Sequence, residues 1–427
     1  MKLIRLLRDN FGIVLFICLL SYGVYSQGST QSIFLCLALF LMAVLKEENV
    51  AVCFIAQTFM CDNLELLPSL SFASLAAGVL IVRCVVTGNK GNIGSKNIPF
   101  ILLLFAIQVF SIVIYENTLN NVIRFCVNIL VIFYFANYSK IFQTKNLALV
   151  PSVVSITVLM ACILGVGKAS IMDDLGVLRF SGIWIDDNFC GMYCVLGIIS
   201  SIYAIWVTRK ALFFAIPSIL MALYMGALAM SRTFVYMMIL VFLLFLLYIF
   251  RNKSVGVFLK VVLSALCVVG AVYFFNHIAS TIIENRGIVK DSGDFTNGRI
   301  EASLESLRVF NMNPLSWFTG IGTSNTFNCK MALGMHPKAS HNTYVDILVE
   351  LGLTVIIYVL VLIIGFFKKF FRNFLYALPY TALFSFVVLC YMGTLTMGQY
   401  SILYIAFGMI LNYLRIPINE NTSEKHR

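Results

Sequence analysis

One histidine and three arginines of this sequence stand in the connections between long apolar runs or at the ends of those runs, where such side chains are rarely found without a partner or a task. His341 begins the stretch HNTYVDILVELGL, Arg232 lies in SRTF, Arg299 ends NGR, and Arg179 begins RFSGIWIDDNF. An imidazole can take a proton from a hydroxyl near neutral pH. A guanidinium offers a planar fork of donors to a carboxylate or a phosphate. The four residues therefore indicate a general base and a binding site for an anion.

The apolar run that follows His341 begins with a polar stripe. Asn342, Asp346 and Glu350 follow i, i+4, i+8 spacing, so a helix places them on one face. Such a face has to meet other helices, an arginine or water rather than lipid. We expect Asn342 to position the base or the acceptor and Asp346 to tune its surroundings. Glu350 is expected to be a structural hydrogen-bond partner of neighbouring helices.

Two further polar positions extend this set of candidate substrate-binding residues. Arg124 lies about one turn inside an apolar run, at the same membrane face as the others. Ser231 precedes Arg232 in the short connection between two runs.

Each candidate also has a purely structural explanation. Arg232 can extend to lipid phosphate from a tight turn, and Arg179 can form an ion pair with Asp186 or Asp187. Arg299 can simply cover the polar side of a surface helix. His341 can be a surface histidine without a role. The sequence leaves these alternatives open.

The amino-acid composition indicates that the segments holding these residues lie in a lipid bilayer. Hydrophobic residues make up 60% of the 427 residues, charged residues make up 11%, and the mean hydropathy is +0.94. These values lie outside the range of soluble domains and indicate an integral membrane protein. The net charge of +11 reflects membrane topology, so no nucleic-acid partner is expected.

Apolar runs of roughly 15 to 22 residues, long enough to cross the bilayer as helices, occur about fourteen times (12–14). They are continuously apolar rather than alternating, which favours helices over barrel strands. The second and third runs are short and could form one re-entrant pair. We therefore predict an all-α, polytopic membrane protein with a single domain spanning residues 1–427. The runs lie near 4–25, 31–45, 48–62, 68–88, 98–115, 118–138, 147–166, 188–207, 211–230, 233–250, 255–275, 342–366, 373–393 and 396–414.

Lysines and arginines cluster in alternate connections between these runs and at both ends of the chain. The positive-inside rule makes that side cytoplasmic and places both termini there. The first run could instead be a signal peptide, because Val24 and Ser26 have a plausible cleavage spacing. The remaining topology is the same in either case.

The longest connection, residues 276–341, is then predicted to be extracytoplasmic. Loops of this length are usually functional or disordered. Its apolar residues Ile300, Leu304, Leu307 and Phe310 recur near helical spacing, which predicts an amphipathic helix on the membrane or on the helix bundle. The other charged side chains of this loop, Lys330 among them, are expected to be solvated or to contact lipid.

Neither a metal site nor a cofactor is expected. The twelve cysteines are scattered, mostly within apolar runs, and have no ligand spacing. Acidic residues form neighbouring pairs rather than a DxD pattern. Asp186 and Asp187 could hold Mg²⁺, but the spacing for an oxygen cage is absent.

Taken together, four stretches resemble the motifs of the O-antigen polymerase and ligase superfamily. They are RFSGIWIDDNF, SRTF, NGR followed by PLSWFTGIGTSN, and SHNTYVDILVELGL, in the order of that family. The resemblance covers roughly residues 175–366 and adds Asn188, of the acidic-Asn pair, to the candidate binding residues. This chain has Asp-Asp-Asn where the family more commonly has Asp-Pro-Asn or Asn-Pro-Asn.

The resemblance implies a GT-C-like helical fold in the bacterial cytoplasmic (inner) membrane and a glycosyltransferase activity. The implied donor is an oligosaccharide linked to a polyisoprenoid diphosphate such as undecaprenyl diphosphate, joined outside the membrane for O-antigen, capsule or exopolysaccharide. Arg179, Arg232 and Arg299 would stabilise the diphosphate leaving group without a metal, and His341 would activate the acceptor hydroxyl. Implied partners are membrane lipid and a flippase and a chain-length regulator of the same pathway.

Two other functions remain open. The same motifs suit a ligase that transfers the glycan to a different acceptor, such as a lipid A core, as well as a repeat-unit polymerase. A transporter or flippase for the lipid-linked glycan is the alternative from another class. Transporters usually show repeats and binding residues at the membrane midplane, whereas the polar residues here gather toward one face and in one late loop. This distribution favours an enzyme, and we expect the polymerase.

Overall fold

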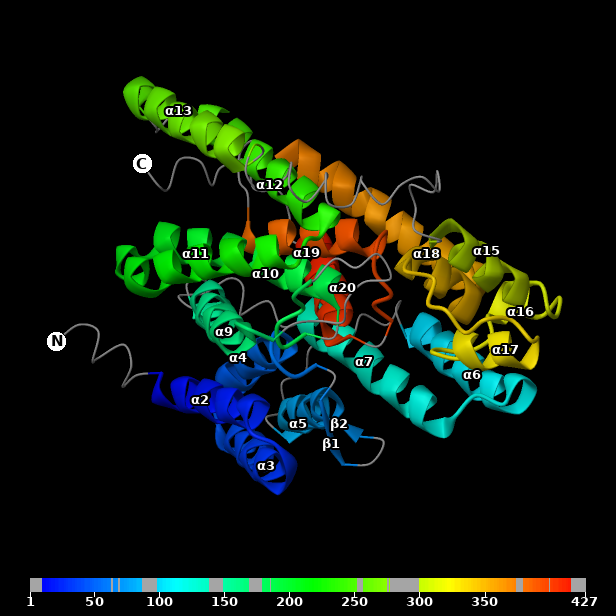
Figure 1. The fold of residues 1–427 in the computed structure, drawn as a ribbon. Helices are drawn as coiled ribbons and strands as arrows, with labels where there is room; N and C mark the ends of the chain where they lie inside the picture. The colour runs from blue at the N-terminus through cyan, green and yellow to red at the C-terminus, as the bar shows by residue number, and fades with distance from the viewer. Residues whose placement is uncertain are drawn as a thin grey trace.

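Helices form nearly all of the ordered structure (Figure 1). The computed structural model describes residues 10–62, 64–67, 70–86, 98–137, 149–168, 179–184, 186–251, 256–274, 276, 299–373, 379–398 and 400–415. Within these residues the strands are a short antiparallel pair, β1 (Glu65–Leu67) and β2 (Leu70–Ser71). The helices before the long loop are α2 (Phe11–Tyr25), α3 (Gly28–Val44), α4 (Glu47–Thr58), α5 (Phe72–Val86), α6 (Ile98–Tyr115), α7 (Leu119–Asn137), α9 (Leu149–Gly165), α10 (Asp187–Val207), α11 (Leu212–Leu228), α12 (Arg232–Arg251) and α13 (Val257–Phe274), with a 3₁₀ turn, η3 (Arg209–Ala211), before α11. The later helices are α15 (Arg299–Phe310), α16 (Ser316–Thr319), α17 (Thr326–Ala332), α18 (Thr343–Asn373), α19 (Tyr380–Met392) and α20 (Ser401–Arg415).

The apolar runs of the sequence correspond to helices, and the prediction of an all-α membrane protein is confirmed at this level. Among the described residues, five helical segments are long and apolar enough to cross a membrane. Seven shorter apolar helices accompany them. These segments define a polytopic membrane protein, while the expected number of spans and the GT-C-like arrangement stay predictions. The five segments are Leu119–Asn137, Asp187–Val207, Arg209–Leu228, Arg232–Phe250 and Thr343–Asn373.

Helix α10 lies at the centre of the bundle and packs against α9, α11, α12 and α19 (Figure 1). Small residues allow its close contacts. A Cβ atom on Gly197 would lie 2.5 Å from Val158 of α9. Buried hydroxyl pairs join the helices: Ser201 to Ser155 at 2.7 Å, and Ser200 to Tyr380 at 2.9 Å. Hydrogen bonds between small polar side chains are a usual way of joining helices in an apolar environment.

Helix α18 is broken at Gly352, which has φ 80° and ψ 174°. The sequence predicts one continuous helix over 342–366. The structure instead has two helical pieces, which together reach Asn373. The break leaves the carbonyls of Val349 and Glu350 without helical partners, and the backbone N–H groups of Ile321 and Gly322 donate to them at 3.0 and 2.9 Å. The long loop is therefore held to α18 through backbone hydrogen bonds.

The predicted amphipathic helix of the long loop is present as α15, which packs on α17 and α18. The residues that it buries are Ala302, Ser306, Val309 and Phe310. Ile300 and Leu304 remain 58% and 51% exposed. The predicted apolar stripe is therefore divided: Phe310 is buried and Leu307 packs against the same cluster, whereas Ile300 and Leu304 face outward. The part of the loop at 277–298 lies outside the described residues.

Candidate active site

His341 lies at the start of α18 in an unusual backbone conformation. Its φ of 51° is in the left-handed region, which residues other than glycine seldom adopt. The backbone N–H of His341 donates to Oγ1 of Thr396, in the turn before α20, at 3.1 Å. The side chain is partly buried. Strained backbone of this kind is common at functional sites, where surrounding contacts hold it in place.

The first turn of α18 is capped by the residues beside His341. Oδ1 of Asn342 accepts hydrogen bonds from the backbone N–H groups of Tyr344 at 3.0 Å and Val345 at 3.3 Å, as an N-cap does. Oγ of Ser340 donates to Oδ1 of Asp346 and accepts from the N–H of Asn342. Asn342 and Asp346 are thus parts of the network that holds the start of α18, next to His341.

Three charged side chains from different segments act on His341. They are Arg299 at the start of α15, Lys338 in the preceding loop, and Asp186 immediately before α10. Burial lowers the pKa of His341 below its usual 6.5; the charges of Arg299 and Lys338 lower it further, and Asp186 opposes them. The imidazole is therefore neutral near pH 7, which is the state in which it can accept a proton.

The start of α10 brings in Arg179. Asp187 and Arg179 form an ion pair, which is the structural alternative that the sequence offered for this arginine. Nε of Arg179 also donates to the carbonyl of Ala229, in the turn between α11 and α12, at 3.3 Å. Asp186 caps α10, because one of its carboxylate oxygens accepts from the N–H of Asn188 at 2.6 Å. Asp186 and Asp187 thus connect the surroundings of His341 with Arg179.

Asn188 and Ser231 contact each other. Oγ of Ser231 donates to Oδ1 of Asn188 at 2.9 Å, and both residues are buried. The side-chain amide of Asn188 also donates to Asp186 and Asp187. This pair ties the start of α10 to the α11–α12 turn, and Arg232 follows directly, partly buried, as the first residue of α12.

Arg124 belongs to a different group of residues. It donates to Oγ of Ser71, at the end of β2, at a long 3.5 Å, and its charge acts on Asp62 and Tyr404. The structure thus joins Arg299, Asp186 and His341 in one group and Arg179, Asp187, Asn188 and Ser231 in an adjoining one. Among the contacts of the described residues, none joins Arg124 or Arg232 to His341 directly.

Lys330 is a residue whose role sequence reasoning missed. We expected it to be solvated, but its side chain is fully buried. Nζ donates to the carbonyls of Ala302 at 3.2 Å and Lys338 at 2.7 Å, and burial lowers its pKa although Glu305 and Asp346 oppose that shift. The lysine thus joins α15, α17 and the approach to His341. No spacing signal marks it, because its partners are backbone carbonyls.

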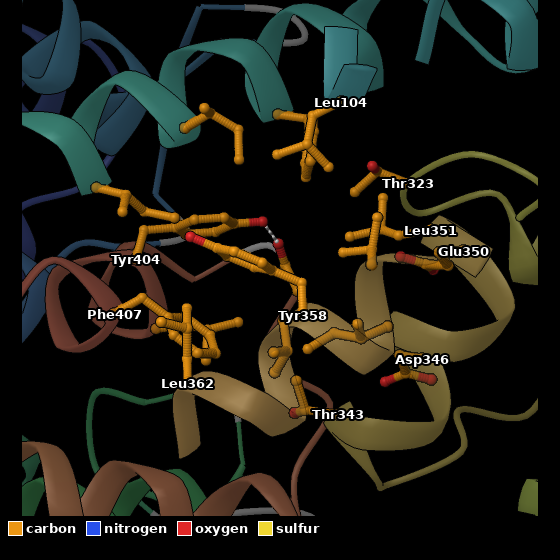
Figure 2. A pocket seen from close by; sticks show the side chains of 18 of the residues that line it. Leu104, Thr323, Thr343, Asp346, Glu350, Leu351, Tyr358, Leu362, Tyr404 and Phe407 are labelled. Carbon is orange, nitrogen blue, oxygen red and sulfur yellow. Dashed lines mark hydrogen bonds between the residues drawn. The ribbon is translucent and has the colours of Figure 1, made fainter. Parts of the chain in front are cut away.

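Glu350 has the structural role that the sequence favours. Its carboxylate accepts from Oγ1 of Thr326 in α17 at 3.1 Å. It also lies with Asp346 at the polar end of an apolar groove between α6, α7, α18 and α20, which Figure 2 shows. The walls of this groove include Leu104, Phe125, Tyr358, Leu362 and Phe407. The groove is therefore apolar along its walls and carries two carboxyl groups at one end.

The fold and this site define a polytopic, all-α membrane protein whose candidate residues lie at or near the ends of its helices. Residues 216–360 match the family model described as O-antigen ligase. The matched segment contains Ser231, Arg232, Arg299, His341 and Asn342. Over this segment the match supports the resemblance to the O-antigen polymerase and ligase superfamily that the motifs indicate, while the motif at 179–189 lies outside it. No curated protein matches the chain.

Proposed function

We propose that this protein is a glycosyltransferase of the inner membrane that polymerises oligosaccharide repeat units linked to a polyisoprenoid diphosphate. His341 takes the proton from the acceptor hydroxyl as that oxygen attacks the anomeric carbon of the donor sugar. The bond from that carbon to the diphosphate breaks, and the electron pair leaves with the diphosphate. Both termini lie in the cytoplasm, and the reaction takes place on the opposite face of the membrane.

The observation that carries this proposal is that the positive charge of Arg299 acts on His341, and that both residues lie inside the segment that matches the family. Burial and neighbouring positive charge keep the imidazole neutral and able to act as a base. The same arginine offers donors to an oxygen of the leaving diphosphate. The proposed base, His341, and the proposed anion-binding residue, Arg299, thus belong to one site. The reaction requires both, because a proton leaves the acceptor while negative charge develops on the diphosphate.

Arg179 and Arg232 are proposed as the remaining members of the anion site. Both lie where the start of α10 meets the α11–α12 turn, which Asn188 and Ser231 hold together. The ion pair with Asp187 fixes the position of the Arg179 guanidinium. Arginines placed in advance by protein contacts stabilise developing negative charge without the cost of reorganising in the transition state. We therefore propose metal-independent transfer.

Polymerase and ligase share this chemistry and differ in the acceptor. The test is a chain-length gel of lipid-linked glycan from cells that lack the protein, complemented with wild type, His341→Ala or His336→Ala at matched membrane levels. His336 lies in the same loop but is exposed, and it serves as the matched control. We expect wild type and His336→Ala to restore a ladder and His341→Ala to leave single repeat units on their carrier.

Other outcomes assign the protein differently. Long chains that form without the protein but stay unattached to their acceptor identify a ligase, whose site would be the same. Glycan trapped on the cytoplasmic side identifies a transporter. A full ladder with His341→Ala would contradict the base assignment.

A further inference from the structure

A second, smaller cavity lies where three distant segments of the chain meet. Its lining comes from the end of α4 and the α4–β1 connection, from the segment leading into α10 and the first turns of that helix, and from the residue before α20. Its one charged group is the carboxyl of Asp62, Thr58 adds a hydroxyl, and its aromatic side chains are Trp184, Phe189, Tyr193 and Tyr400. None of the candidate residues discussed above lines it.

The two oxygens of Asp62 have different surroundings. Oδ2 accepts a hydrogen bond from the backbone N–H of Ser401, the first residue of α20, at 2.8 Å. Oδ1 is buried and has no hydrogen-bond partner among the described residues. Asp62 as a whole is only 5% exposed. A buried carboxylate oxygen without a donor is costly, and it is satisfied when a ligand supplies an O–H or N–H group.

Aromatic rings surround this acceptor. Phe189 and Tyr400 stack with their centroids 4.1 Å apart, and Trp184 and Tyr193 stack at 5.7 Å. The indole N–H of Trp184 donates to the carbonyl of Phe59 at 2.9 Å, which fixes the ring. Rigid rings of this kind offer flat apolar surfaces with little loss of side-chain entropy.

Two short stretches of chain connect the cavity to the surroundings of His341. Trp184 lies two residues before Asp186, which acts on His341. Tyr400 lies four residues after Thr396, whose hydroxyl accepts from the backbone N–H of His341. The expected topology also places the three lining segments on the same membrane face as His341. A glycan that reaches His341 can therefore extend to this cavity.

We infer that this cavity is a sugar-binding subsite, in which a pyranose ring of the glycan lies against the aromatic rings and donates a hydroxyl hydrogen bond to Oδ1 of Asp62. This inference rests on the proposed function and assigns a substrate-specificity role to Asp62, Trp184 and Tyr400. A ring with axial C–H groups on one face and hydroxyls at its edge matches flat apolar walls with one acceptor. A diphosphate does not, because the carboxylate repels it.

The structure suggests an informative substitution. In Asp62→Asn, the amide oxygen can still accept from Ser401, which preserves the cap of α20. The unpartnered oxygen becomes an NH₂ group, which cannot accept from a sugar hydroxyl. Tyr400→Ala is an independent second test, because it removes one aromatic ring from the wall of the cavity. Neither residue is part of the proposed acid–base or arginine machinery.

Binding can be measured through Trp184. The chain has three tryptophans, and Trp206 and Trp317 are 51% and 49% exposed, so Phe replaces them with little expected cost. The single-tryptophan protein in detergent is titrated with repeat-unit oligosaccharide released by mild acid from the lipid-linked glycan of the same cells. Pyrophosphate is the control ligand. Glycan elongation by the same variants is followed separately in vesicles.

We expect a saturable change in Trp184 fluorescence with the oligosaccharide and none with pyrophosphate. Asp62→Asn and Tyr400→Ala should each weaken binding about tenfold, roughly the loss of one charge-assisted hydrogen bond or of one stacking surface. In vesicles, KM should rise more than kcat falls. Unchanged affinity in Asp62→Asn with an unchanged melting temperature overturns the subsite, as does a fluorescence change produced equally by pyrophosphate. If wild type elongates glycan in vesicles, the proposed function stands even when the binding result overturns the subsite. If wild type does not elongate glycan, the proposed function is refuted, whatever the binding result.

Discussion

Gly320 of the long loop and Gly352 of α18 approach each other backbone against backbone. A Cβ atom on Gly352 would lie 2.7 Å from the backbone nitrogen of Gly320 and 2.3 Å from the carbonyl oxygen of Phe318. A Cβ atom on Gly320 would lie 2.2 Å from the carbonyl oxygen of Glu350. Both glycines have positive φ. The loop and the start of α18 therefore form one unit only because both positions lack side chains.

Gly352→Ala should destabilise the protein strongly. The conformation alone costs alanine about 1–3 kcal/mol, and the contact with Phe318 adds to this. Gly365→Ala in the same helix is the matched control, because its Cβ would meet only Leu414, at 3.9 Å. We expect the first variant to lower the melting temperature in detergent and the second to keep or raise it. Equal melting temperatures would show that the loop is not held at the break.

The value of kcat/KM for the transfer reaction should fall at acid pH, and the midpoint of this fall should lie below pH 6.5. Folding lowers the pKa of His341, mainly through burial, so the folded state disfavours the protonated imidazole. Its contribution to stability is complete above pH 6.5 and is lost as the pH falls through that value toward the folded pKa. The pH dependence of kcat/KM, together with the melting temperature at each pH, checks this expectation.

Substitution of the charged residues around His341 should shift the midpoint of this fall in kcat/KM, to higher pH when a positive charge is removed and to lower pH when a negative charge is removed. Lys338→Gln removes a positive charge and should shift it to higher pH, as should Arg299→Gln in whatever activity remains. Asp186→Asn removes the opposing negative charge and should shift it to lower pH, while the amide can still cap α10. Shifts of the same sign in Lys338→Gln and Asp186→Asn would exclude His341 as the titrating group.

The ion pair of Arg179 and Asp187 separates a structural role from substrate binding. Arg179→Met leaves a buried carboxylate unpaired, which typically costs about 3–5 kcal/mol. Adding Asp187→Asn removes that charge and should restore most of the melting temperature. We expect glycan transfer to stay low in the double variant, because the anion site still lacks its arginine. Full activity of the stable double variant would show that Arg179 only positions α10.

Lys330→Met should loosen the approach to His341. The substitution removes the donor to the carbonyls of Ala302 and Lys338 and costs about 1–3 kcal/mol for polar groups left unsatisfied. Hydrogen exchange should become faster in residues 336–340. Lys338→Met is the control, because the side chain of Lys338 is exposed and only its backbone carbonyl takes part. Unchanged exchange in Lys330→Met would contradict this role of the lysine.

The sequence predicts much of the fold because lipid imposes a simple rule. A chain in hydrocarbon must satisfy its backbone hydrogen bonds internally, so long apolar runs become helices, and their approximate bounds can be read directly. The amphipathic spacing of α15 was predicted for the same kind of reason. The break at Gly352 was not predicted, because a glycine inside an apolar run resembles any other helical position. The partners of the broken turn, Ile321 and Gly322, come from a distant loop.

The candidate residues were found from their chemical types, but their grouping was not. Arginine, histidine and asparagine at the ends of apolar runs or in the connections between them are conspicuous in any sequence of this composition, which is why His341, Arg232 and Arg299 were identified. In the sequence, Asp62 looks like an ordinary polar residue at the end of an apolar run, and Lys330 looks like a solvated lysine of a loop. Their burial depends on segments far away in the chain, such as α20 for Asp62 and α15 for Lys330.

Hydropathy and charge act locally along the chain, so the amino-acid sequence is enough to identify a helical membrane protein with polar residues gathered in its later connections. Which of those residues meet depends on the packing of the helices. This packing places Arg299 and Asp186 around His341, joins Arg179 to Asp187, and sets Arg124 apart with Asp62. These meetings depend on how helices pack and where loops cross between them, which no local pattern specifies.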